Sequence, residues 1–343
     1  MTGAQGPEVP RDGAVNPNEP LVSKPPSARV AFSVLRFVVV VGIVAGILYA
    51  TFSNWAEVKA AIAVVPPLSL VLAFMATALG IFSGVRVWHV VLQEMGSDPT
   101  FIRAAQVNLV GLLGKYLPGS VWAYVLQTEL SNRAGIPRAR AFVALLVATG
   151  VSAVSAFAMA PLALPLVEEP LARLALALAP LTIITLYPPL LGWIVRTALR
   201  VLRRPQPNIA FDWPHVRRAV GWSLITWSCF GSQLWLLANS LTDPGLGGWV
   251  RSTSAMALAM TLGFLAFLAP SGLGVREAFI VAALTPQLST GAALGIALLS
   301  RFLFTVADVL TAGGAAYAAR RETSPAHPVD VEGIHRGDAH DRR

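Results

Sequence analysis

Charged residues and cysteines are both scarce in this sequence. Only 13% of its 343 residues are charged and 55% are hydrophobic, whereas soluble proteins carry roughly 25% charged residues. This excludes a water-soluble enzyme core of the ordinary kind and indicates a protein that lies in a lipid bilayer. The one cysteine, Cys229, lies in an apolar run. It excludes an intramolecular disulfide framework and any cysteine-based zinc or iron–sulfur site.

Motifs of the common enzyme classes are also missing. The sequence has no Gly-x-Ser-x-Gly elbow, no His-Glu-x-x-His motif and no nucleotide-binding loop. We therefore expect no enzymatic activity and no cofactor. We also expect no metal site, since His327, His335 and His340 follow no regular spacing. The net charge of +8 suits either nucleic acid or the cytoplasmic loops of a membrane protein. The basic loops are too short for a nucleic-acid domain, so we expect no nucleic-acid partner.

Long apolar runs indicate membrane spans, because about 20 apolar residues in a helix cross the hydrocarbon layer. The proline-rich residues 1–28 are predicted to be a disordered cytoplasmic tail, and residues 321–343 a disordered C-terminal tail. Arg86, Trp88 and His89 are expected to anchor the end of the second span at the membrane surface. Six runs between the tails qualify as full spans: Val30 to Phe52, Val64 to Val85, Ala141 to Val167, Leu171 to Val195, Ala219 to Ser240 and Thr290 to Ala319.

Two further apolar stretches are interrupted in the same way. Each has a glycine, six residues, a proline and then another glycine: Gly111 to Gly119 and Gly263 to Gly272. Proline removes a backbone donor and glycine lets the chain reverse, so each stretch is predicted to form two half-helices around a break. The break residues are Pro118, Gly119, Pro270, Gly272 and Gly274. Chance is the alternative explanation, because glycine and proline are common in membrane helices.

The basic residues favour re-entrant hairpins over full spans at both stretches. With a cytoplasmic N-terminus and two such hairpins, the outer segments hold only Lys59, Arg173 and Arg251, as the positive-inside rule requires. The inner segments then hold Lys24, Arg29, Arg86, Arg103, Arg133, Arg138, Arg140, Arg196, Arg200, Arg203, Arg204, Arg217, Arg218, Arg320 and Arg321.

The predicted fold is thus an all-α polytopic transmembrane bundle over residues 29–320, with about six full spans and two broken re-entrant hairpins. Its halves, about 29–168 and 169–320, form an inverted repeat. Inverted repeats with broken helices recur in alternating-access transporters, which bind substrate where the repeats meet. We expect a multi-pass protein of the cell (inner or plasma) membrane, with both termini in the cytoplasm.

The second break carries the most unusual charges. Arg276 and Glu277 follow a glycine-rich turn and precede an apolar run, and a turn leading into a helix N-terminus resembles an anion site. They either contact a substrate headgroup or pair within the bundle to hold the hairpin. Arg301 and Asp308 share one face of the last span. Arg301 is expected to meet Glu277 or a substrate anion, and Asp308 to meet Arg276 or take up a proton. The alternative is an internal salt-bridge network.

The first hairpin offers a polar and aromatic lining on both sides of Pro118. Lys115, three residues before the break, is a candidate for contact with a phosphate, or else its stem extends to the membrane surface. The aromatic residues either line a cavity or lie at the membrane surface. The candidate lining comprises Asn108, Lys115, Tyr116, Ser120, Trp122, Tyr124, Gln127 and Glu129.

Around both breaks the sequence resembles the membrane region of the lysylphosphatidylglycerol synthetase family, a group of flippase-like membrane proteins. The resemblance covers about residues 30–320. It implies a polytopic protein that moves, or helps to move, a lipid or lipid-linked product. Members that synthesise the lipid carry a soluble aminoacyl-transfer domain, so with 23 residues after Arg320 we expect no synthesis by this chain. The motifs are Gly114-Lys-Tyr-Leu-Pro-Gly-Ser-Val-Trp122, Gly135-Ile-Pro137, Ala269-Pro-Ser-Gly-Leu-Gly-Val-Arg-Glu277 and Leu299-Ser-Arg301.

The functional hypothesis is a translocase for an anionic lipid or a lipid-linked glycan, with Lys115, Arg276 and Arg301 contacting its phosphate. A non-transporting scaffold for lipid or glycan synthesis enzymes is the alternative, and such enzymes are its possible partners. A membrane glycosyltransferase is a third hypothesis and would need an acidic residue on an outward loop. Glu57, Glu168, Glu169 and Asp243 are available there, without a recognisable arrangement.

Overall fold

The computed structural model describes residues 45–116, 122–159, 161–162, 170–201, 211–265 and 272–322, and within these ranges every regular element is a helix. Residues 45–53 are helical. The elements that follow are α2 (Trp55–Val64), α3 (Pro67–Glu94), α4 (Phe101–Leu112), the 3₁₀ helix η1 (Leu113–Tyr116), α5 (Trp122–Arg133), α6 (Arg138–Ala158), α7 (Pro170–Leu178), the 3₁₀ helix η3 (Ala179–Leu186), α8 (Pro188–Val201), α9 (Trp213–Ala238), α10 (Leu246–Leu265), α11 (Val275–Leu284) and α12 (Thr290–Glu322).

Three of the described helices, α3, α6 and α12, are long and apolar enough to cross a membrane. They coincide with the second, third and sixth predicted spans. The predicted span from Ala219 to Ser240 lies in α9, a continuous helix of 26 residues that is more polar. Most of the first predicted span, the predicted N-terminal tail, the predicted C-terminal tail from residue 323 onwards, and Val167 lie outside the described residues. The all-helical membrane architecture is confirmed, while the number of spans stays a prediction.

The predicted span from Leu171 to Val195 is not one helix. The structure divides it into α7, η3 and α8, with a change of direction at Tyr187, whose ψ is 120°. Pro180 lies in the 3₁₀ segment, and Pro188 follows the turn. Proline lacks an amide donor and its ring clashes with the preceding turn, so the α-helical hydrogen bonds are interrupted at these positions. Hydropathy alone did not reveal this interruption.

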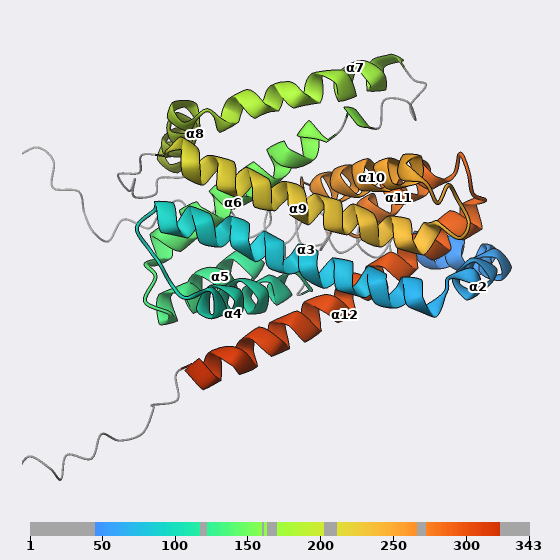
Figure 1. Ribbon diagram of the computed structural model, residues 1–343, viewed down its shortest axis with the longest axis horizontal. Coiled ribbons are helices and arrows are strands. Elements are labelled where there is room, and N and C mark those ends of the chain that lie inside the picture. Colours follow the sequence, from blue (N-terminus) through green and yellow to red (C-terminus); the bar gives the residue numbers. More distant parts are fainter. Residues whose placement is uncertain are drawn as a thin grey trace, which may run out of the picture.

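Both interrupted stretches have the form of hairpins in the described part of the chain. Helix α4 packs beside α5, and α10 packs beside α11. Figure 1 shows the α4–α5 pair in one half of the bundle and the α10–α11 pair in the opposite half. In the same view α3 and α9, which pack along each other, run in opposite directions. The first and second halves of the bundle are therefore arranged as the predicted inverted repeat requires.

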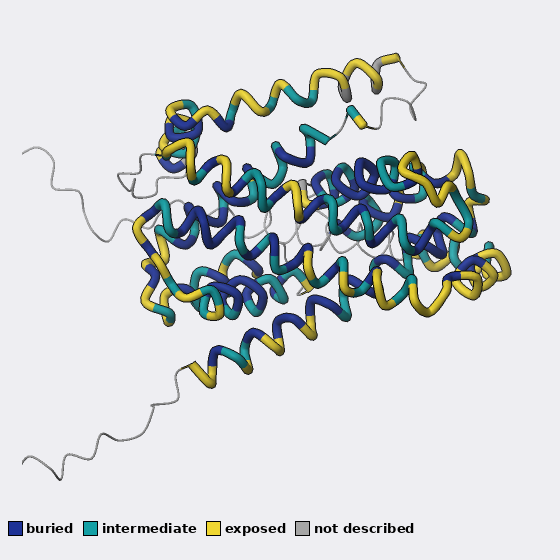
Figure 2. Tube along the Cα trace, viewed as in Figure 1, coloured by how far each residue is buried: buried dark blue, intermediate teal, exposed yellow. Residues whose placement is uncertain are grey.

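The interior of the bundle is apolar, and so is much of its surface. Figure 2 shows buried residues along the middle of α3, α9 and α10, and exposed ones on α2 and α7. Many exposed side chains are large and apolar, as a surface that faces lipid requires. Leu68, Val71, Met75 and Leu79 on α3 are examples, each 57–67% exposed.

The proposed surface anchor at the end of the second span is wrong. Helix α3 continues to Glu94, so Trp88 and His89 lie inside it and are only 1% and 4% exposed. The guanidinium of Arg86 lies 3.9 Å above the ring of Phe101 on α4. These three side chains therefore pack within the bundle, where α3 meets the first hairpin.

Candidate functional site

At the turn of the first hairpin, between α4 and α5, two side chains contact α12. In η1, Lys115 Nζ lies 2.5 Å from Asp308 Oδ2, and the Tyr116 hydroxyl donates a hydrogen bond of 2.6 Å to the same oxygen. Gly114 permits the tight turn because a Cβ there would lie 2.7 Å from the backbone nitrogen of Ala123 in α5. Asp308 is 8% exposed. One buried carboxylate thus holds two groups from the hairpin.

The second hairpin presents its charges at the start of α11. Gly272 and Gly274 have φ angles of 65° and 85°, the left-handed region that glycine tolerates. Glu277 Oε2 accepts a hydrogen bond of 2.7 Å from the backbone N–H of Gly274, which caps the helix N-terminus. Its other oxygen, Oε1, accepts 2.5 Å from Arg301 Nη1 on α12. Glu277 is 3% exposed and the Arg301 side chain 23%, so the carboxylate of this ion pair is buried and the guanidinium is partly exposed.

Arg276 is held by different partners from its neighbour. Its Nη2 donates to Ser300 Oγ over 3.0 Å, and Ser300 donates in turn to Gln233 Oε1 on α9 over 3.1 Å. Its guanidinium carbon lies 4.3 Å from the centre of the Phe304 ring, a cation–π contact. Arg276 is 7% exposed, and its Nε has no hydrogen-bond partner within the described chain. A buried arginine therefore keeps one donor unused.

Helix α12 connects these contacts, because Ser300, Arg301, Phe304 and Asp308 face the two hairpin ends. We call Lys115, Arg276, Glu277, Arg301 and Asp308 the charged centre. Its three cations and two carboxylates leave one positive charge in excess. Opposite charges in a medium of low dielectric attract strongly, and an unpaired one is costly. The arrangement can therefore bind an anion that replaces, or adds to, its own carboxylates.

The structure brings most of the predicted site residues together, with one change of partner. Arg301 pairs with Glu277, as one of the sequence expectations had it. Asp308 pairs with Lys115 and Tyr116 rather than with Arg276. Asn108 is buried on α4 at 6% exposure. Pro118, Gly119, Ser120 and Pro270 lie outside the described residues.

The rest of the predicted lining of the first hairpin is divided. Gln127 is 1% exposed, and its side-chain amide has no hydrogen-bond partner in the described chain. The Tyr124 ring lies 6.4 Å from that of Phe264 on α10, and Trp122 is 48% exposed. Glu129 is not part of a cavity lining, because it pairs with Arg133 and Arg138 on the surface.

Gln233, Ser300 and Phe304 are contacts that the sequence did not single out. Gln233 is a polar side chain inside an apolar run, and this is the signal that would have found it, because such residues in membrane helices usually face a partner. Ser300 lies next to Arg301, within the Leu299-Ser-Arg301 motif. Nothing in the local pattern indicates the contact between Phe304 and Arg276, which are 28 positions apart.

The acidic residues considered for a glycosyltransferase have local roles where they are described. Glu57 accepts a hydrogen bond of 2.5 Å from Ser289. Asp243 accepts hydrogen bonds from the backbone N–H groups of Gly245 and Gly248. Glu168 and Glu169 lie outside the described residues.

Comparison with known families gives one match. A model described as the lysylphosphatidylglycerol synthase TM region matches residues 34–312. This range includes both hairpins, α9 and the part of α12 that carries Arg301 and Asp308. No curated protein matches the chain.

Proposed function

The chain belongs to the lysylphosphatidylglycerol synthase TM region family, and we propose that it translocates an anionic lipid or a polyprenyl-phosphate-linked glycan across the bilayer. The family makes it a membrane protein concerned with lipids. The observation that carries the finer proposal is the charged centre, where the ends of two oppositely oriented hairpins meet α12. Transporters with inverted repeats bind substrate at such a meeting point.

Two carboxylates occupy the places that a substrate phosphate would take. Glu277 already holds Arg301 and the N–H of Gly274, and Asp308 holds Lys115. A phosphate carries several acceptor oxygens and suits both an arginine fork and a helix N-terminus. In the proposal it displaces Glu277 from Arg301 and uses the free Nε of Arg276. Protonation of either carboxylate would release the same cations and couple translocation to protons.

The proposal has no covalent step. The charged side chains act as binding groups, and the lipid leaves chemically unchanged. The basic residues of α5, α9 and α12 favour a cytoplasmic position for the ends of the bundle that carry Arg133, Arg217 and Arg320, by the positive-inside rule. We therefore place the protein in the cell membrane with both termini in the cytoplasm and lipid as its main partner.

Translocation by purified protein in proteoliposomes tests this function. The probe is fluorescent phosphatidylglycerol, with fluorescent phosphatidylcholine as the zwitterionic counterpart of zero net charge, and movement is followed by dithionite quenching. Arg276→Ala and Arg301→Ala are each expected to slow the anionic probe at least about tenfold, because a charge-assisted hydrogen bond contributes about 1.5–3 kcal/mol. Arg138→Ala removes a surface arginine and is the matched control, with wild-type rates expected.

Two results would contradict the proposal. The first is a wild-type rate in both Arg276→Ala and Arg301→Ala, with elution from size exclusion as for the parent protein. The second is equal movement of phosphatidylcholine and phosphatidylglycerol.

A scaffold for lipid or glycan synthesis enzymes is the second candidate, favoured by one observation. Every carboxylate of the charged centre already has an internal partner, as a centre that only locks the bundle would have. In that case Arg301→Ala lowers thermal stability, and crosslinking in membranes captures protein partners without enriched lipid. Wild-type translocation activity would exclude this candidate.

A further inference from the structure

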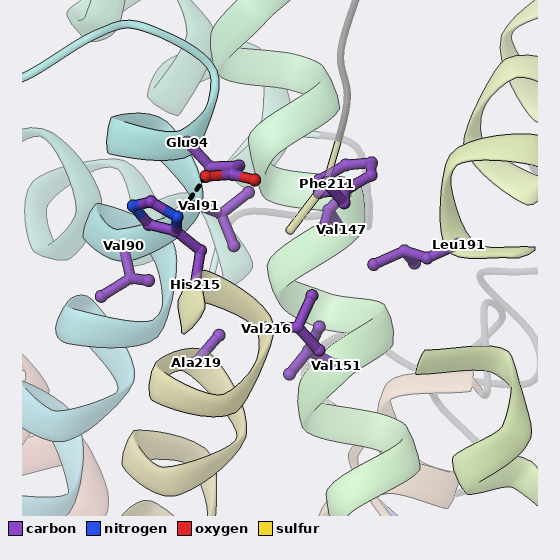
Figure 3. A pocket seen from close by; sticks show the side chains of 10 residues that line it. All are labelled: Val90, Val91, Glu94, Val147, Val151, Leu191, Phe211, His215, Val216 and Ala219. Carbon is purple, nitrogen blue, oxygen red and sulfur yellow. Dashed lines mark ion pairs between the residues drawn. The ribbon is translucent and has the colours of Figure 1, made fainter. Parts of the chain in front are cut away.

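A second polar cluster lies where α3 ends and α9 begins. Glu94, Asp212 and His215 each offer one ligand atom, and these atoms all lie within 4.8 Å of one another. His215 Nδ1 is 2.5 Å from Glu94 Oε2 and 2.7 Å from Asp212 Oδ1. Figure 3 shows Glu94 and His215 facing each other at the edge of a pocket whose other labelled residues are all apolar.

The backbone holds the two carboxylates in place. Glu94 is the last residue of α3, and its Oε1 accepts a hydrogen bond of 2.7 Å from the backbone N–H of Asp212. Asp212 is the N-cap of α9 and accepts from the backbone N–H of His215 over 3.1 Å. Both carboxylates are therefore oriented by backbone N–H groups.

A hydrogen bond does not fully account for this arrangement. One Nδ1–H donates one straight hydrogen bond, yet two carboxylate oxygens lie within 2.7 Å of Nδ1. Two carboxylates and one imidazole each offer one ligand atom, and these atoms lie within 4.8 Å of one another. A divalent cation accepts all three ligand atoms at once.

We propose that Glu94, Asp212 and His215 bind a Zn²⁺ ion that joins the end of α3 to the start of α9. Imidazole nitrogen and carboxylate oxygen are both zinc ligands, at about 2.0–2.2 Å. Ligand atoms around such an ion lie further from one another than His215 Nδ1 lies from the two carboxylate oxygens in this structure. The three side chains therefore move outward by roughly a few tenths of an ångström when the ion binds. Water completes the fourth position on the open side of Asp212, which is 53% exposed.

The surroundings suit a bound ion. The Asp212 N–H leaves Glu94 Oε2 facing the site by holding Oε1, the kind of outer contact that orients a metal ligand. Val91, Val147, Val216 and Phe211 line the adjoining pocket and limit water on that side. The cluster contains none of the residues of the charged centre, so the proposal does not depend on the proposed function.

Zinc titration of the full chain tests the site. The protein is purified without a polyhistidine tag, treated with EDTA and titrated with ZnCl₂ in detergent, with binding followed by calorimetry and thermal unfolding by tryptophan fluorescence. One saturable Zn²⁺ per chain is expected, with a rise in midpoint temperature, because a ligand of the native state stabilises it. Glu94→Gln, Asp212→Asn and His215→Gln should each weaken binding at least about tenfold.

A variant with His327, His335 and His340 all changed to Gln is the matched control. It removes the three histidines near the C-terminus, which could take up zinc adventitiously, and it should bind as the wild type does. X-ray absorption of the zinc-loaded protein should show nitrogen and oxygen ligands including one imidazole.

Several outcomes would overturn the proposal. These are a wild-type protein without saturable binding, binding that survives Asp212→Asn, binding that is lost in the tail variant, and a sulfur ligand, which would point to Cys229. Asp212 is largely exposed, so its variant tests the site even if a change at buried Glu94 prevents folding.

Discussion

The two hairpins share a shape but present charge in opposite ways. The first supplies only a cation, Lys115, and takes its carboxylate from α12. The second carries the adjacent charged residues Arg276 and Glu277, and Arg301 on α12 pairs with Glu277. Exposure differs little, since the side chains of Lys115 and Arg301 are 30% and 23% exposed and those of Asp308 and Glu277 are 9% and 4% exposed. Glu277 differs from Lys115 in that it also caps the N-terminus of α11. The two hairpins therefore share their arrangement while the charged residues near their breaks differ.

That comparison assumes that the two hairpins have opposite orientations in the membrane. Labelling of single cysteines tests this assumption, because each cysteine is accessible from one side of the membrane only. On a Cys229→Ser background, Asn132→Cys at the end of α5 and Thr285→Cys at the end of α11 both lie at exposed positions. A membrane-impermeant maleimide is expected to label the first only from the cytoplasmic side and the second only from outside. Thr100→Cys and Leu246→Cys, at the starts of α4 and α10 and therefore at the other ends of the same hairpins, should follow Asn132 and Thr285 respectively. Any pair that splits between the two sides would turn that hairpin into a full span and remove the inverted repeat.

Loss of the buried carboxylate in the second hairpin is expected to have the larger effect on stability. Glu277→Gln should lower the free energy of unfolding by about 3 kcal/mol, because Arg301 is left without its carboxylate at a largely buried site. Thermal unfolding in detergent, followed by tryptophan fluorescence, measures the change. Glu129→Gln breaks an exposed pair with Arg138 and should cost less than about 1 kcal/mol. Equal losses in the two variants would mean that burial of the second hairpin's charges is unimportant.

The first hairpin should respond less to loss of its charge. Lys115→Met is expected to cost about 1 kcal/mol, because the lysine is partly exposed and water screens its ion pair. Asp308 also keeps the hydrogen bond from Tyr116. The same unfolding measurement applies. A loss greater than that of Glu277→Gln would contradict the difference between the hairpins that their contacts predict.

Sequence patterns predicted the parts of the molecule that depend on lipid and on local breaks. Apolar runs located α3, α6 and α12, since a bilayer imposes length and composition on a span. Proline and glycine located both hairpins, and basic residues predicted their opposite orientation, which the arrangement of the helices matches. Arg301 and Glu277 were expected to pair because a charge inside a span needs a partner.

Contacts between distant segments escaped prediction for a physical reason. Asp308 has Arg276, Lys115 and solvent as possible partners, and only the packing of η1 against α12 decides among them. Glu94 and Asp212 are 118 positions apart, so no local pattern in the sequence could predict their contact. His89 looked like a surface anchor because the apolar run ends near it, yet helix α4 covers it in the fold.

The two ion pairs on α12 also bear on the electrical insulation of the membrane. A path wide enough for a charged headgroup would admit chloride if its cations stood free, and a membrane potential would drive that leak. In this structure Lys115 and Arg301 each have a carboxylate oxygen 2.5 Å away. A small anion would have to compete with the carboxylate of Asp308 or Glu277, which is covalently attached to the chain and cannot diffuse away. We therefore expect the resting protein to conduct no chloride current, because its own carboxylates occupy the positions that chloride would take.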